Sequence, residues 1–157
     1  MKVKPILSSR QLTPLIEILI VITFFASATA VLAQIFAKAH NDSRLAHDIN
    51  SAALFVGECA ERVRAADLET ALSAGCLPGF EAEDGASAAG GRIFCAYLDS
   101  DFNTVSRELA YATVSYEAGT KEVGAAGVLL TGLFVCTRKD GEELIGINTA
   151  VFYEGEP

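Results

Sequence analysis

The chain has 157 residues and a formal net charge of −8, and 51% of its residues are hydrophobic. This length leaves room for one small domain besides a membrane segment. Residues 1–66 carry seven bases and five acids, whereas residues 67–157 carry five bases and fifteen acids. Because binding to a phosphate backbone relies on Lys and Arg, the acidic second part excludes nucleic acid as its expected partner.

A basic leader, residues 1–12, precedes an apolar segment that we place at residues 13–38. Residues 18–37 contain no charged side chain. Twenty helical residues span about 30 Å, which is the thickness of the hydrocarbon core of a bilayer. The positive-inside rule then predicts a single-pass protein of the cell membrane with a cytoplasmic N-terminus. Residues 39–157 would form an extracytoplasmic head domain.

Glu17 stands directly before this uncharged run. A carboxylate costs about 2.5–3.5 kcal/mol at the centre of a membrane and less near its interface. Two interpretations follow: Glu17 is a tolerated interfacial charge, or it is kept for a partner.

The first long element is predicted to be one continuous helix from Thr13 to about residue 65. Thr13 suits the N-cap position and Pro14 the first helical position, and no further proline occurs before Pro78. After Lys38 the helix becomes one-sided, and its apolar residues recur every three or four positions. They are Leu45, Ile49, Ala52, Val56, Cys59 and Val63. We expect the head domain to cover this stripe, and a partner helix is the alternative.

The remaining elements are predicted to be a short helix at residues 67–76, a loop at 77–91, and four strands. The strands are expected at residues 92–98, 109–117, 128–139 and 142–153, with a flexible loop at 118–127. Asp140-Gly141 between the last two strands is a strong hairpin signal. The expected fold class is therefore α+β, a long N-terminal helix packed on a four-stranded antiparallel sheet.

The cysteines lack the spacing of a metal site, and no metal or cofactor is expected. Cys95 and Cys136 both lie in strand-like segments and are our choice for a disulfide across the sheet. His40 and His47 are seven residues apart, whereas metal ligands on a helix usually lie three or four apart. Asp99 in LDSDFN is assigned to a turn rather than to a calcium loop. No nucleophile elbow, phosphate-binding loop or carboxylate pair is found, so we do not expect an enzyme.

The N-terminal pattern resembles the prepilin-type segment of type IV pilins and of the pseudopilins of type II secretion and competence systems. The resemblance rests on the basic leader, on LIEILIVI at residues 15–22, and on the long helix that follows. It is close over residues 12–37 and looser to about residue 65. It implies that Thr13 is the first mature residue, methylated at its amine, and that Glu17 is the glutamate that guides subunit assembly.

Two positions depart from the family pattern: Leu12 replaces the glycine before the cleavage site, and Thr13 replaces the usual phenylalanine after it. The chain would then either retain its leader or belong to a divergent minor-subunit branch. The expected partners are other pilin or pseudopilin subunits, the inner-membrane assembly machinery and, with cleavage left open, the prepilin peptidase. The alternative function is a signal-anchored or secreted surface binding domain, since Val31-Leu32-Ala33 before Gln34 fits a signal-peptidase site.

Overall fold

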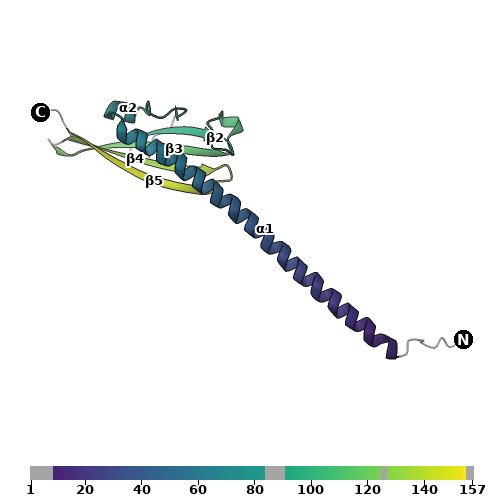
Figure 1. Cartoon of the computed structure of the whole chain (residues 1–157). Helices are drawn as coiled ribbons and strands as arrows, with labels where there is room; N and C mark the ends of the chain where they lie inside the picture. The colour runs from purple at the N-terminus through teal and green to yellow at the C-terminus, as the bar shows by residue number, and fades with distance from the viewer. Residues whose placement is uncertain (1–8, 84–90, 125–126, 155–157) are drawn as a thin grey trace. The chain divides into compact units, whose positions relative to one another are not determined.

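The computed structural model describes residues 9–83, 91–124 and 127–154, with side chains from residue 14 onward. The chain separates into two compact units, Met1–Leu45 and Ala46–Pro157. Helix α1 (Ser9–Ala65) contributes to both units (Figure 1). Pro14 lies inside this helix rather than at the predicted first helical position, because the helix begins before it.

The second unit contains a five-stranded antiparallel meander with the strand order β1-β2-β3-β4-β5. The strands are β1 (Glu81–Ala82), β2 (Arg92–Leu98), β3 (Ala112–Glu122), β4 (Gly127–Arg138) and β5 (Glu143–Glu154). The part of α1 that belongs to this unit lies against one face of the sheet (Figure 1). The α+β class is therefore confirmed, with one strand more than expected.

The differences from the expected elements lie in segments rich in small or polar residues. The predicted loop at 118–127 is shorter than expected, because residues 118–122 continue β3 in ladder register with β4. The two-residue strand β1 lies in the predicted loop at 77–91 and carries no apolar alternation. Helix α2 (Leu68–Leu72) is shorter than predicted, with Asp67 as its N-cap. The hairpin at Asp140-Gly141 is confirmed, and Gly141 has a φ of 89°, which glycine adopts without strain.

The apolar stripe of α1 is buried over most of the predicted length in the second unit. Ala52, Val56 and Val63 are completely inaccessible, and Cys59 is 5% exposed. Ile49, by contrast, is 39% exposed. The stripe is thus covered internally from Ala52 to Val63, as expected, whereas Ile49 lies outside this cover.

Tyr116 of β3 lies at the centre of the core between two other aromatic rings. Its ring stacks on Phe134 of β4 with centroids 4.5 Å apart and lies 6.3 Å from Phe94 of β2. Gly132 makes room for this ring, since a Cβ there would come within 2.7 Å of Tyr116 Cε2. Burial raises the pKa of the Tyr116 hydroxyl to about 12, so it stays protonated. This cluster joins three adjacent strands beneath the helix.

We expect Val56→Asp to destabilise the head domain by several kcal/mol, because it buries a carboxylate without a partner. Leu54→Asp is the matched control, since Leu54 lies on the same helix but is 70% exposed. Thermal unfolding of the full chain in detergent micelles measures both. Equal melting temperatures for Val56→Asp and the parent would mean that this stripe faces something other than the sheet.

Candidate functional site

The apolar part of α1 in the first unit exposes its large side chains all round the helix. Examples are Ile18, Phe24 and Phe36, at 60%, 67% and 71% exposure. By length and composition this helix could cross a membrane, a property that signal sequences near an N-terminus share. Glu17 is exposed among these residues and makes no hydrogen bond or ion pair within the described part of the chain.

Hydroxyl groups in the same segment are satisfied by the helix itself. Thr23 Oγ1 donates to the carbonyl oxygen of Leu19 at 2.8 Å, and Ser27 and Thr29 donate in the same way to carbonyls four residues earlier. Such bonds let hydroxyls lie in an apolar environment without a partner from outside the helix. Glu17 makes no such bond within the described residues. In an apolar environment its carboxylate would therefore need a partner from outside the helix.

The proposed processing positions Leu12 and Thr13 lie in the helical backbone of α1, but their side chains fall outside the described residues. The predicted N-cap role of Thr13 is wrong, because α1 begins at Ser9, before that residue. The cleavage prediction itself stays a prediction.

Asp48 is a residue whose role the sequence pattern missed. It is charged and not among the residues of the apolar stripe, yet it is 8% exposed and faces the sheet. The hydroxyl of Tyr111 donates to Asp48 Oδ2 at 2.6 Å, and Arg138 Nη1 lies 3.7 Å from the same oxygen. The signal that could have revealed this role is the spacing, since Asp48 lies four residues before Ala52 and eight before Val56, both fully buried.

Arg138 connects this carboxylate to the β4–β5 hairpin. Its guanidinium also donates to Asp140 at 2.6 Å and to Glu142. The hydrogen bond to Arg138 lowers the pKa of Asp140, and the hydrogen bond to Asp48 raises the pKa of Tyr111. The contribution of Asp140 to stability is therefore lost as the pH falls below its ordinary pKa. The contribution of Tyr111 to stability is lost as the pH rises above the ordinary pKa of a tyrosine hydroxyl.

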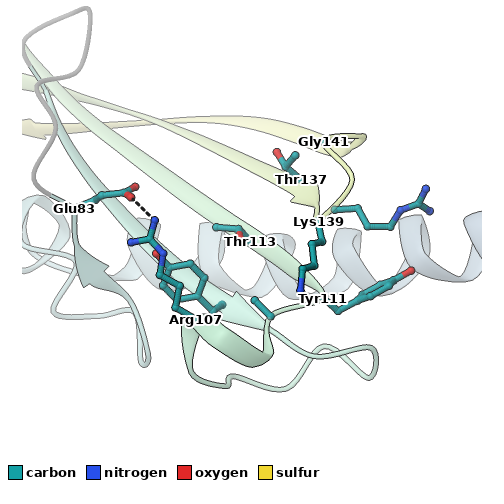
Figure 2. Close-up of a pocket in the computed structure, with 10 residues that line it drawn as sticks. Glu83, Arg107, Tyr111, Thr113, Thr137, Lys139 and Gly141 are labelled. Carbon is teal, nitrogen blue, oxygen red and sulfur yellow. Dashed lines mark ion pairs between the residues drawn. The ribbon is translucent and has the colours of Figure 1, made fainter.

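A cleft of about 420 Å³ lies beside this network and is drawn in Figure 2. Arg107 lines it, 3.7 Å from Glu83 and 5.6 Å above the ring of Tyr97. Lys139 and the paired threonines Thr113 and Thr137 complete much of the lining. The ion pair of Arg107 with Glu83 is solvated, since the two side chains are 74% and 43% exposed. Among the charged side chains of this lining, Glu83, Arg107 and Lys139 are exposed to solvent.

The expected disulfide is incompatible with the sheet geometry. Cys95 is opposite Ser115 of β3, whereas Cys136 is opposite Val114, so their side chains point to opposite faces. They are also two strands apart, about 9.5 Å at the usual strand spacing, beyond the reach of a disulfide. All four cysteines are free. Strand assignments alone could not reveal this, because the face depends on the register.

The other polar residues considered from the sequence stay apart from any site. Asp99 Oδ1 accepts hydrogen bonds from the backbone N–H groups of Asp101 and Asn103, both at 2.9 Å, which confirms the predicted turn. Among the described residues, no group of three or more His, Cys, Asp or Glu side chains could hold a metal ion.

Comparisons of the chain with protein-family models, with curated proteins and with solved structures found no match.

We expect Asp48→Ala to destabilise the head domain by about 2 kcal/mol, because it leaves the Tyr111 hydroxyl and part of the Arg138 charge without their partner. Tyr111→Phe should cost about 1 kcal/mol, since it removes only the hydroxyl. Denaturant unfolding of each variant and of the double variant measures the coupling. Strictly additive effects would contradict a direct Asp48–Tyr111 interaction.

We expect the cysteines to differ in reactivity in the native protein. Burial raises the pKa of Cys59 and Cys136 to about 11, and mainly burial raises that of Cys95 to about 12. These thiols should resist alkylation at neutral pH, and half-buried Cys76 should react first. Mass mapping of iodoacetamide-treated protein under non-reducing conditions tests this order. A Cys95–Cys136 bridge in that map would contradict the strand register.

Proposed function

We propose that the protein is a structural subunit, a minor pilin or pseudopilin, of a type IV filament-type system such as type II secretion, competence or a pilus. The observation that carries this proposal is helix α1. It continues without a break from an exposed apolar segment into a stripe that packs on a folded head. A single helix of this kind can be held in a membrane and later in a bundle of like helices.

Glu17 is the residue to which the proposal assigns assembly. In a bundle of apolar helices an unpaired carboxylate is strongly disfavoured, whereas one paired with a cation is tolerated. The prepilin resemblance implies that the cation is the N-terminal amine of the adjacent subunit, created by leader cleavage before Thr13. If Leu12 prevents cleavage, another cation must take its place. The hydroxyls of the segment need no such partner, because they bond within the helix.

The head domain has a non-catalytic role in this proposal. Its acidic surface lies on the extracytoplasmic side, and its contacts are with other subunits and the inner-membrane assembly machinery. Mainly because of burial, three of its four thiols have a pKa of about 11 or 12, so they are weak nucleophiles at neutral pH.

The alternative is a signal-anchored or secreted surface binding domain. Secretion would require cleavage after Ala33, and α1 continues through that position as regular helix. Signal-peptidase sites follow an apolar region of about 7–15 residues, whereas the uncharged run here continues past Ala33 to Ala37. The anchored form of this alternative differs from the pilin proposal in one respect, which is the role of Glu17.

We expect Glu17→Leu to leave membrane insertion intact and to abolish incorporation into the assembly, because the variant loses the charge that pairs with the neighbouring subunit. Gln34→Leu is the matched control, since it also replaces a polar side chain of the apolar segment by leucine but removes no charge. Membrane fractionation measures insertion, and cross-linking to the other subunits measures incorporation.

Undiminished incorporation of Glu17→Leu would remove the physical argument for a pilin-type role. The intact mass of the membrane-derived protein is a further control. A chain that begins at Thr13 supports processing despite Leu12, whereas a chain that begins at Gln34 contradicts the proposal.

A further inference from the structure

One edge of the sheet is closed by the chain's own backbone. Strand β2 lies at this edge, and the short strand β1 pairs with it at Phe94 and Cys95. On either side of that pairing, the N–H of Glu83 donates to the carbonyl of Ile93, and the N–H of Val105 donates to the carbonyl of Tyr97. Backbone groups at the start, middle and end of the outer side of β2 are therefore engaged.

The opposite edge, formed by β5, has no such cover within the described residues. Every backbone hydrogen bond between strands that involves residues 143–154 belongs to the ladder with β4, and no turn or loop segment bonds to their outer side. Strand β5 has 12 residues, an edge of about 40 Å at the usual rise of a strand. Figure 1 shows it in yellow as the outermost strand of the sheet.

The ladder pattern identifies which backbone groups of β5 face outward. In the neighbouring β3–β4 hairpin, the N–H of Val123 donates to the carbonyl of Gly127. Hydrogen-bonded and non-hydrogen-bonded pairs alternate along antiparallel strands. The backbone N–H and C=O groups of odd-numbered β4 residues therefore point toward β3, and those of even-numbered β4 residues point toward β5. The β4–β5 register pairs these even-numbered residues with odd-numbered residues of β5, whose backbone groups therefore point toward β4. The outward N–H and C=O groups thus belong to even-numbered residues, among them Gly146, Asn148, Ala150 and Phe152.

This edge lacks the features that normally prevent strands from associating. Edge strands are usually short, or carry lysine, proline or an inward-pointing charge. The ten residues from 144 to 153, LIGINTAVFY, contain no charge and no proline. The side chains of Ile145, Ile147 and Val151 on the helix side are only half-buried, so an added strand would cover more apolar surface.

We propose that β5 is a docking edge for an extended segment of another polypeptide, which adds a sixth strand to the sheet. Charge indicates the chemistry of that segment. Glu143 and Glu154 stand exposed at the two ends of the uncharged run and make no ion pair among the described residues. A partner strand with Lys or Arg at its ends and an uncharged alternating centre complements this edge.

A second copy of the chain is disfavoured as the occupant. Antiparallel pairing of β5 with itself must match the even-numbered outward residues of the two copies, so over nearly its full length it would place Glu154 opposite Glu142 or beside Glu143 of the other copy at both ends. Like charges directly opposite each other destabilise a strand pair, and both heads are strongly acidic. The proposal does not depend on the filament role, and its failure would leave the Glu17 experiment unaffected.

The test uses the full chain in detergent micelles and a fluorescent peptide with an alternating Thr-Val centre and lysine pairs at both ends. Binding is measured by anisotropy, and residue-resolved amide exchange locates the contact. We expect the amides of Gly146, Asn148, Ala150 and Phe152 to gain protection, while those of odd-numbered β5 residues, already in the ladder, change little. A peptide ending in glutamates should bind more weakly.

Ala150→Pro should weaken binding about tenfold, because it removes an outward N–H without breaking the ladder to β4. Ala150→Thr is the matched control, since it keeps the N–H and suits a strand. If Ala150→Pro lowers the melting temperature, Asn148→Lys is used as the test variant instead. The Asn148→Lys variant keeps every backbone N–H and repels the lysine-ended peptide.

Three results would overturn the proposal: no saturable binding of the lysine-ended peptide, equal binding by the parent and the edge variants, or equal binding of the glutamate-ended peptide. Concentration-dependent protection of the same amides without peptide would also overturn it, by showing that the occupant is a second copy.

Discussion

The burial of one face of α1 against the sheet is the contact on which the head domain depends. Ala52, Val56 and Val63 are completely inaccessible there, and they lie over a sheet face whose centre is Tyr116 stacked on Phe134. Small and β-branched residues on the helix let it approach the aromatic cluster closely, and Gly132 leaves space for the tyrosine ring. The apolar side chains of the first unit, by contrast, are exposed, and the proposed function assigns their cover to lipid or to other helices.

Polar contacts at the edge of this interface specify how the helix lies on the sheet. Asp48 accepts the Tyr111 hydroxyl and lies beside Arg138, which in turn bonds to Asp140 in the β4–β5 hairpin. Apolar packing tolerates small shifts of a helix along its axis, whereas a buried carboxylate that loses its partners is costly. The network therefore favours one register of helix on sheet and ties it to the geometry of the hairpin.

The two kinds of exposed surface suggest two different kinds of association. Glu17 lies in an apolar helical segment, where an ion pair in a low-dielectric environment would be selective for one neighbour. The β5 edge instead offers backbone hydrogen bonds, with charge only at its ends, and would select a partner by its extended conformation. In the two proposed roles, the chain joins a helical bundle through α1 while its head contacts a different polypeptide.

The sequence by itself determined the long helix, the apolar segment with Glu17, the α+β class and the Asp140-Gly141 hairpin, because these depend on local periodicity and turn chemistry. Only the tertiary structure decided what depends on register and on distant neighbours. It extended β3 through residues 118–122, which pair with β4 despite their loop-like composition. It separated Cys95 from Cys136, since a strand's two faces differ by a single residue of register. It also buried Asp48, whose partners Tyr111 and Arg138 are more than sixty residues away in the chain, a distance over which local patterns carry no information.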